Sequence, residues 1–258
     1  MKNVYLFLIG LVALSGCTQS KKDMLNQING IANAKIQNGE NKAKMNALKR
    51  QFIEQFPEDS LAKTFHEDVI VYYELVDSFD LSLQLAEQYL SLYPNSEALS
   101  DLYLTMGHAY TGLGKYTSAL SYFEKTQEAR DLTTGELRDL DEILKNLVDS
   151  ASGQQKADYI RKRAGVAQVI STPMDAMMLY HELYTDFPNS SYAPFAMMQH
   201  ASVLESTGDL AGAQELLEKL IKTYPESSFA KDAERMIKLG LLGKSAEEQL
   251  EIILNQAS

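Results

Sequence analysis

The chain has 258 residues, of which 45% are apolar and 23% charged, a composition typical of a folded globular protein. Its single cysteine excludes an internal disulfide and a thiolate metal cluster. The 35 acidic residues outnumber the 24 Lys and Arg residues, and the net charge of −11 opposes generic binding to nucleic-acid phosphate or anionic lipid. We therefore expect a protein partner, with no nucleic acid and no small-molecule substrate.

The N-terminal segment has the pattern of a secretory signal peptide. Lys2 precedes an uncharged run over residues 4–14, which is too short to span a bilayer as a helix. The run ends in Leu14-Ser15-Gly16-Cys17, which resembles the lipobox of bacterial lipoproteins. The resemblance implies that residues 1–16 are removed by cleavage between Gly16 and Cys17 and that Cys17 carries a covalent lipid, with no other cofactor. The alternative is an ordinary signal peptide with an incidental cysteine.

The residues after Cys17 bear on the destination of the lipoprotein. They are Thr18-Gln19-Ser20, without the Asp that the resemblance associates with retention in the inner membrane. No acidic run of the kind that directs some lipoproteins to the cell surface follows. We expect a chain anchored by its lipid in the outer membrane and facing the periplasm.

Four aromatic-proline pairs punctuate the rest of the chain. They are Phe56-Pro57, Tyr93-Pro94, Phe187-Pro188 and Tyr224-Pro225. Proline cannot continue a helix, and the polar residues that follow each pair are typical of a helix start. Pro57 and Pro94 are 37 residues apart, as are Pro188 and Pro225. This spacing is typical of repeated helical hairpins.

Residues 100–133 carry small and large side chains in a fixed register, and the register returns 94 residues later. Both segments resemble the tetratricopeptide repeat, which places small residues where two helices approach closely. The resemblance assigns this structural role to Gly107, Gly114, Ala119, Ala201, Gly208 and Ala213. A third copy, at Ile70, Tyr73, Phe79, Ser82, Ala86 and Tyr89, lacks the turn glycine. The predicted fold class is all-α, a tetratricopeptide-like solenoid of antiparallel helical hairpins.

Helices are expected over nearly the whole chain after residue 21. Their predicted ranges are 22–38, 41–55, 60–77, 80–92, 96–113, 116–129, 134–150, 154–170, 174–186, 191–206, 209–223, 227–240 and 245–255.

One stretch interrupts the repeat. Pro94 and Pro188 are 94 residues apart, twenty more than two repeats of 37, and Thr133 with Glu136 predicts a capping box before an extra helix. We expect an irregular seam at residues 131–156 that divides two stacks; the alternative is an overlong loop and helix on one face. The predicted parts are 17–40 (tether and first helix), 41–132 (first stack), 133–156 (extra helix), 157–242 (second stack) and 243–258 (capping helix).

No catalytic constellation is evident, so we predict a protein without enzymatic activity. His66, His108, His181 and His200 are far apart in sequence and form no pair at metal-ligand spacing, which predicts no metal site. No phosphate-binding loop or nucleophile motif occurs. A methionine cluster is interpreted as core, with an adaptable binding surface as the alternative; it comprises Met174, Met177, Met178, Met197 and Met198.

The tetratricopeptide resemblance also implies a groove, lined by the first helix of each pair, that binds a partner's peptide or helix. The predicted lining is mixed apolar and acidic, which favours a basic or neutral segment of the partner. It comprises Glu67, Val71, Glu74, Asp101, Leu104, His108, Thr111, Phe195, Met198, Ser202 and Glu205.

Residues 187–194 further resemble repeats of outer-membrane assembly lipoproteins and of a periplasmic protein associated with the Tol system. The leading hypothesis is a lipid-anchored interaction scaffold of the cell envelope that binds another envelope protein. One alternative is an assembly lipoprotein resembling the barrel-insertion machinery, which differs in its partner. A second is a lipoprotein that captures glycans or nutrients.

Overall fold

The computed structural model describes residues 19–34, 38–170 and 173–256. Gly16 and Cys17, the predicted cleavage and lipidation positions, lie outside these residues. Within them the chain forms α-helices and no strand, and its helical hairpins confirm the predicted tetratricopeptide-like class. No helix in the described ranges is both long enough and apolar enough to cross a bilayer.

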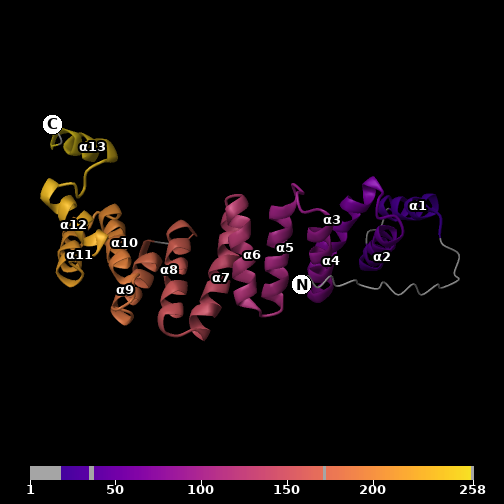
Figure 1. Cartoon of the computed structure of the whole chain (residues 1–258), viewed down its shortest axis with the longest axis horizontal. Helices are drawn as coiled ribbons and strands as arrows, with labels where there is room; N and C mark the ends of the chain where they lie inside the picture. The colour runs from indigo at the N-terminus through magenta and orange to yellow at the C-terminus, as the bar shows by residue number, and fades with distance from the viewer. Residues whose placement is uncertain (1–18, 35–37, 171–172, 257–258) are drawn as a thin grey trace, which may run out of the picture. The chain divides into compact units, whose positions relative to one another are not determined.

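The chain divides between Tyr93 and Pro94 into two compact units (Figure 1). The helices of the first unit are α1 (Lys21–Ala32), α2 (Gly39–Gln55), α3 (Ser60–Leu75) and α4 (Phe79–Leu92). Those of the second are α5 (Leu99–Gly112), α6 (Tyr116–Ala129), α7 (Thr134–Ser150), α8 (Gly153–Ile170), α9 (Pro173–Asp186), α10 (Ala193–Ser206), α11 (Leu210–Thr223), α12 (Ser228–Leu239) and α13 (Ala246–Gln256).

These bounds follow the predicted ranges closely except at the first helix. Residues 22–38 were expected to be one helix, but α1 ends at Ala32, and the side chain of Asn38 caps α2 by accepting the N–H of Asn41 at 2.8 Å. Asn33 follows α1 in a non-helical conformation. Asn has a low helix propensity and favours caps and turns, which explains the earlier end.

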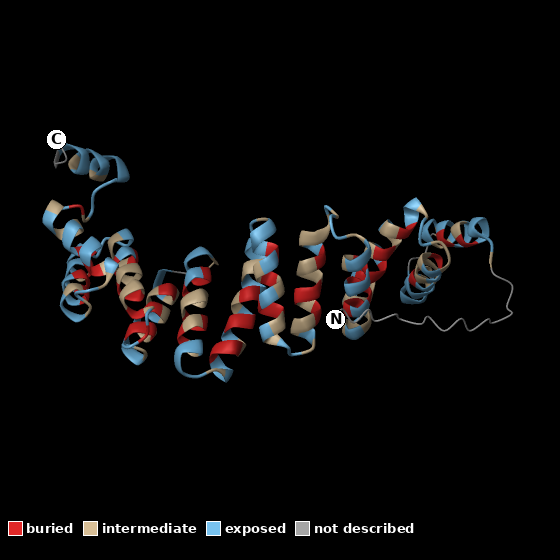
Figure 2. Cartoon of the chain, viewed as in Figure 1, coloured by how far each residue is buried: buried red, intermediate tan, exposed pale blue. Residues whose placement is uncertain are grey.

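In each unit, helices that are consecutive in sequence pack against one another from α1 to α4 and from α5 to α12. Met24, Phe52, Ile70 and Tyr89 are fully buried in the first unit. In the second unit one apolar cluster runs from Ala119 to Ala233 through α6 to α12. Figure 2 shows the buried residues on the sides where neighbouring helices meet.

The small residues of the repeat lie inside the helix pairs. Gly107 is buried against Phe123, and Ala119, Ala201 and Ala213 are at most 2% exposed. A small side chain at each of these positions lets two helix backbones approach closely, as ridge-into-groove packing requires.

The turns within the three repeat copies share one geometry. Gly114 and Gly208 have φ of 68° and 89°, and Asp77 takes the equivalent place in the copy without a glycine, with φ of 58°. The N–H of the next residue bonds to a carbonyl five residues back in all three turns, as in Lys115 to Tyr110 at 2.9 Å. This is the hydrogen bond of a Schellman C-cap.

The extra helix predicted after Thr133 is present as α7. Thr133 and Glu136 form the reciprocal capping box that the sequence predicts. Arg130 donates two hydrogen bonds of 2.9 Å to the Glu136 carboxylate, which fixes the chain where α6 ends and α7 begins. Helix α7 pairs with α8 (Figure 1). The part boundaries at 132 and 156 stay predictions.

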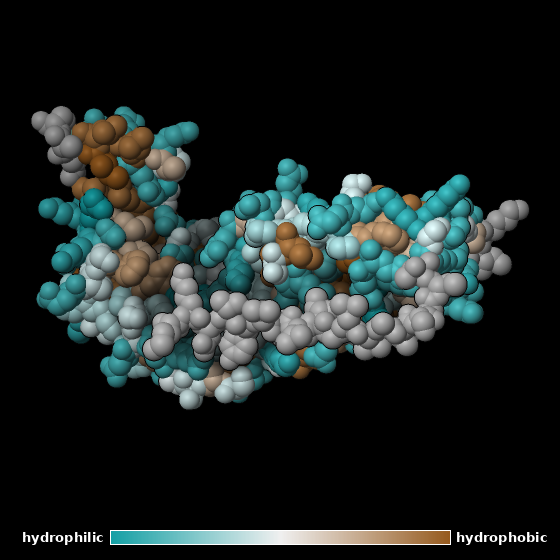
Figure 3. Space-filling model, turned by 45° about the vertical axis from the view of Figure 1, so that its right-hand side comes forward, coloured by the Kyte–Doolittle hydropathy of each residue, from teal (hydrophilic) through white to brown (hydrophobic). Residues whose placement is uncertain are grey.

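The C-terminal helix α13 presents apolar side chains to solvent. Leu250, Ile253 and Leu254 are exposed, and Figure 3 shows a hydrophobic area at this end of the second unit.

Candidate partner-binding surfaces

Two adjoining pockets lie between α6 and α8 in the second unit. The first has a volume of about 340 Å³, and α7 contributes three leucines to it. Its lining comprises Leu120, Glu124, Gln127, Leu137, Leu140, Leu144, Lys162, Gly165, Val166 and Val169. We call it the apolar pocket.

The second, polar pocket has a volume of about 530 Å³. Its lining comprises Thr117, Leu120, Ser121, Glu124, Gln154, Gln155, Asp158, Tyr159, Lys162 and Tyr192. Leu120, Glu124 and Lys162 line both pockets, so the two form one continuous surface, the α6–α8 groove. The groove follows from the packing of α6 and α8 on either side of α7.

An ion pair stands where the two pockets meet. Lys162 Nζ lies 2.5 Å from Glu124 Oε1 and 3.5 Å from Asp158 Oδ2. Burial lowers the pKa of Lys162, but the hydrogen bond to Glu124 and the two carboxylate charges outweigh it and raise the pKa. Lys162 is therefore a permanent cation at the middle of the groove.

A second cation, Arg161, contacts two residues that line the polar pocket, Asp158 and Tyr192. Arg161 donates to Asp158 Oδ1 at 2.9 Å, and its guanidinium lies 4.9 Å from the centre of the Tyr192 ring. Burial raises the pKa of Asp158, and the hydrogen bond from Arg161 and the charge of Lys162 overcome this and lower it. Two cations and two carboxylates thus balance one another around this pocket.

The apolar pocket has unfilled room on its α8 side. Val169 is 68% exposed although it is apolar. A Cβ added at Gly165, in the middle of α8, would meet no atom within 4 Å. The pocket can therefore accept an apolar side chain from another molecule, and a larger residue at Gly165 would occupy that space.

The predicted groove residues lie on three helices, and none of them lines the α6–α8 groove. Glu67, Val71 and Glu74 lie on α3 in the first unit. Val71 is exposed, whereas Glu67 accepts a hydrogen bond from the hydroxyl of Tyr89.

The four predicted residues on α5 make contacts within the second unit. Asp101 lies 3.6 Å from the Arg130 guanidinium, and Leu104 packs against the core. Thr111 donates to the carbonyl of Gly107 at 2.9 Å. His108 Nε2 is 3.4 Å from Asp139 Oδ2 but forms no hydrogen bond with it.

The four predicted residues on α10 differ in exposure. Phe195 packs edge-on against Tyr180 and Phe229, and Met198 packs against the core. Glu205 accepts the N–H of Gly243 at 2.7 Å, and Ser202 is exposed. Their contact with a partner stays a prediction.

The methionine cluster is only partly core. Met197 is buried and Met198 half-buried against the core, whereas Met174 and Met178 are both 59% exposed. The core interpretation is therefore wrong for Met174 and Met178, which are largely exposed on α9. Helical spacing places these residues on one face, but it does not indicate whether a neighbouring helix covers that face.

Sequence reasoning missed the α6–α8 groove. The available signal was Gly165 inside an otherwise helical stretch, followed one turn later by Val169. A glycine in a helix interior is unfavourable by about 1 kcal/mol relative to alanine, and such a position often has a packing or functional reason.

No cluster of three or more His, Cys, Asp or Glu side chains in the described ranges is arranged to hold a metal ion. The structure does bring His181 and His200 together, although they are 19 residues apart in sequence, with ring centres separated by 6.2 Å.

Comparisons with known proteins identify the repeat. Two tetratricopeptide repeat models match residues 100–130 and 195–227, so these segments are tetratricopeptide repeats. No catalytic family is indicated. Comparison with curated proteins gives no match.

The solved structures to which this chain is similar are distant from it in sequence. The TPR2AB domain of yeast Sti1, in a complex with pHSP90, is 14% identical, and the match covers 85% of this chain and 83% of that chain, with a TM-score of 0.39. Kinesin light chain-like repeats from Podosopora anserina are 12% identical over 78% of this chain and 93% of their own, with a TM-score of 0.40. YrrB, a TPR protein with an unusual peptide-binding site, is 16% identical, and the match covers 72% of this chain and 97% of that chain, with a TM-score of 0.33.

Proposed function

We propose that this chain is a lipid-anchored, non-enzymatic scaffold of the bacterial cell envelope that binds a protein partner in the α6–α8 groove. The observation that carries the proposal is the continuity of the apolar and polar pockets through Leu120, Glu124 and Lys162. Tetratricopeptide repeats support a role in protein interaction, because stacked hairpins create extended binding surfaces.

The chemistry of the groove defines the partner segment. An apolar side chain of the partner enters the space beside Gly165 and Val169, where it buries apolar surface that is otherwise exposed to solvent. The adjoining residues of the segment are polar and bond to groups such as Gln155 and Asp158. Because the charges around the polar pocket balance, the segment needs no large net charge.

The anchor in this proposal rests on Leu14-Ser15-Gly16-Cys17. Acyl chains contribute about 0.8 kcal/mol per buried CH₂, so two or more chains hold a protein on a membrane firmly. Confinement to the outer membrane, on its periplasmic face, raises the effective concentration of an envelope partner. A groove with a low intrinsic affinity then suffices to hold that partner.

The groove is tested by photocrosslinking in intact cells. A photoreactive amino acid replaces Val169, and the same amino acid at exposed Glu215 on α11 is the positional control. We expect a protein adduct from position 169 and none from 215. Gly165→Leu should abolish the adduct by filling the apolar pocket, whereas Gly165→Ala should retain it. An unchanged yield of the adduct in the Gly165→Leu protein would show that the groove is not the binding site.

The identity of the adduct separates the alternatives. A component of the barrel-assembly machinery would favour the assembly role, and another envelope protein the general scaffold. Recovery of oligosaccharide alone would reject both and favour glycan capture.

The anchor is tested separately. Cys17→Ala should move the protein from the membrane fraction to the soluble fraction. The control substitution Ser20→Ala, which leaves the cysteine intact, should not. Continued membrane residence of the Cys17→Ala protein would refute lipidation and leave the groove unaffected.

A further inference from the structure

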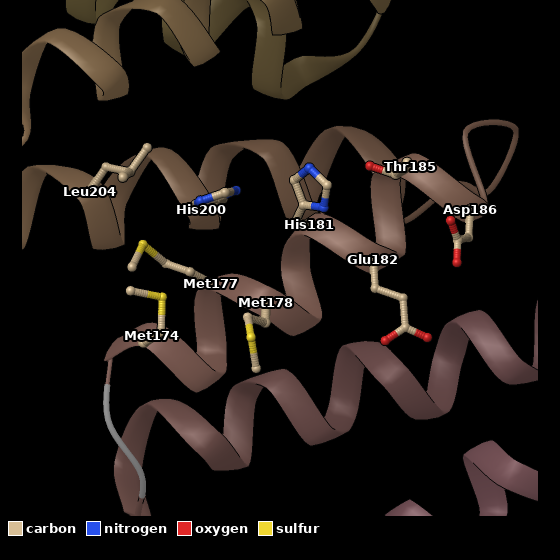
Figure 4. Close-up of a pocket in the computed structure, with 9 residues that line it drawn as sticks. All are labelled: Met174, Met177, Met178, His181, Glu182, Thr185, Asp186, His200 and Leu204. Carbon is tan, nitrogen blue, oxygen red and sulfur yellow. The ribbon is translucent and has the colours of Figure 1, made fainter.

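A third pocket, of about 520 Å³, lies between α9 and α10 and has a different chemistry (Figure 4). Its lining is rich in thioether and imidazole groups and comprises Met174, Met177, Met178, His181, Glu182, Thr185, Asp186, His200 and Leu204. We call it the methionine pocket. The proposed partner binding uses none of these residues.

Helix α9 supplies most of these groups from one face. Met174, Met177 and His181 lie on one face of α9, because residues three, four and seven apart share a face of a helix. In Figure 4 the thioethers of Met174 and Met177 lie on the side of α9 toward His200, and the thioether of Met178 points the other way. Two sulfurs and an imidazole from two helices therefore border the same part of the pocket.

The imidazole of His200 is held in place. Its Nδ1 is 3.2 Å from the hydroxyl of Tyr184, and its ring stacks on the Tyr184 ring with centres 6.0 Å apart. Because one ring nitrogen is engaged with Tyr184, Nε2 is the nitrogen that can coordinate a ligand. A hydrogen bond made by the ring nitrogen that does not bind the metal fixes the orientation of metal-binding histidines.

A second imidazole lies beside His200 at the pocket. His181 lies edge-on to His200, with ring centres 6.2 Å apart, and offers a second imidazole at the same pocket.

Thioether and imidazole groups together select soft cations. Thioethers are poor ligands for the hard cations Mg²⁺ and Ca²⁺, and they favour Cu(I). Ag(I), like Cu(I), is a soft monovalent cation with a closed d shell. The carboxylates that line the pocket, Glu182 and Asp186, lie toward its other end in Figure 4, away from Met174 and Met177.

We propose that the methionine pocket binds one soft monovalent cation, Cu(I) or Ag(I), through Met174, Met177 and His200, with His181 as an additional ligand. The sequence prediction of no metal site considered histidine and carboxylate spacing alone. It could not include the approach of His200 to the methionines of α9, which depends on how α9 and α10 pack.

The test is a titration of the full chain with Cu(I) in competition with bicinchoninate under reducing, anaerobic conditions. All proteins carry Cys17→Ser, because a free thiolate is itself a soft ligand. We expect one Cu(I) per chain, with no comparable binding of Zn²⁺. Ag(I) should shift the methyl NMR signals of Met174 and Met177 and leave that of buried Met197 in place.

Variants assign the ligands. Met177→Leu conserves volume, so it should preserve folding and weaken Cu(I) binding by about tenfold or more, whereas Met178→Leu on the same turn should leave binding unchanged. Tyr184→Phe removes only the hydroxyl next to His200 and should weaken binding by roughly tenfold. Circular dichroism verifies that each variant is folded.

Three results would overturn the proposal. They are no stoichiometric Cu(I) binding by the Cys17→Ser protein, equal losses in Met177→Leu and Met178→Leu, or tighter binding of Zn²⁺ than of Cu(I). None of these results depends on the anchor or on the α6–α8 groove.

Discussion

Gly107 of α5 lies directly against the ring of Phe123 of α6: a Cβ added at Gly107 would come within 2.8 Å of Phe123 Cδ2. Phe123 is fully buried, so its ring cannot swing away. This contact sets how closely the two helices of the repeat at residues 100–130 approach.

Gly107→Ala should therefore destabilise the second unit. Overpacking a filled core costs about 1–3 kcal/mol, which exceeds the gain of about 1 kcal/mol from replacing a helical glycine by alanine. Urea unfolding followed by circular dichroism measures the change. Gly165→Ala is the matched control, because a Cβ there meets nothing, and it should raise the free energy of unfolding by about 1 kcal/mol. A stabilising Gly107→Ala would contradict the close approach.

Repeat turns offer a reciprocal prediction. Asp77 occupies with φ of 58° the place that Gly114 occupies with φ of 68°. A side chain in the left-handed region destabilises the folded state by roughly 1–2 kcal/mol. Glycine makes the unfolded chain more flexible, which lowers the free energy of the unfolded state by about 0.4–1 kcal/mol. Asp77→Gly should therefore raise the free energy of unfolding, by up to about 1.6 kcal/mol.

Gly114→Ala should have the opposite effect and lower the free energy of unfolding by up to about 1.6 kcal/mol, because the stiffer unfolded chain offsets part of the cost in the folded state. The same denaturation experiment compares both variants with the wild type. A loss of stability in Asp77→Gly would mean that the Asp77 side chain contributes more than its backbone conformation costs.

The elements could be predicted from the sequence because their signals are local. The aromatic-proline pairs mark helix ends, and Thr133 with Glu136 marks the start of α7; the structure confirms both. The surfaces could not be predicted in the same way. The α6–α8 groove depends on how α6 and α8 pack beside the extra helix α7, and the approach of His181 to His200 depends on how α9 packs against α10. Periodicity within one helix does not contain that information.

The capping box at α7 predicts an acid-sensitive contact. The hydrogen bond from Arg130 lowers the pKa of Glu136 to about 2, against the raising effect of burial and with help from Thr133. Since the ordinary value is 4.5, ionised Glu136 stabilises the fold above about pH 4.5, and this contribution is lost as the pH falls toward 2.

Glu136→Gln should cost about 1 kcal/mol at pH 7 and reduce the loss of stability between pH 4.5 and 3. Glu142→Gln, at an exposed position on the same helix, is the control and should be close to neutral. Urea unfolding at a series of pH values gives both quantities. Equal acid sensitivity in Glu136→Gln and the wild type would show that other carboxylates dominate.

His66 predicts a separate effect near neutral pH in the first unit. The ring is 1% exposed, its Nε2 lies 3.0 Å from the carbonyl of Leu85, and its Nδ1 has no hydrogen-bond partner. Burial lowers the pKa of His66, although the Leu85 carbonyl and the charge of Glu67 act in the opposite direction. The folded protein therefore holds His66 neutral, with Nε2–H donating to Leu85.

Because the folded pKa lies below the unfolded value of 6.5, the unfolded chain binds more protons between these two values. Stability is then complete above about pH 6.5 and falls below it, by up to about 1.4 kcal/mol per pH unit, until the folded protein also becomes protonated. Hydrogen exchange of the α3 amides, measured at pH 7.5 and 5.5, reports the stability of the first unit at each pH. His66→Gln keeps a donor for Leu85 and cannot titrate, so the fall should shrink in that variant. An unchanged pH dependence in His66→Gln would assign the effect to other groups.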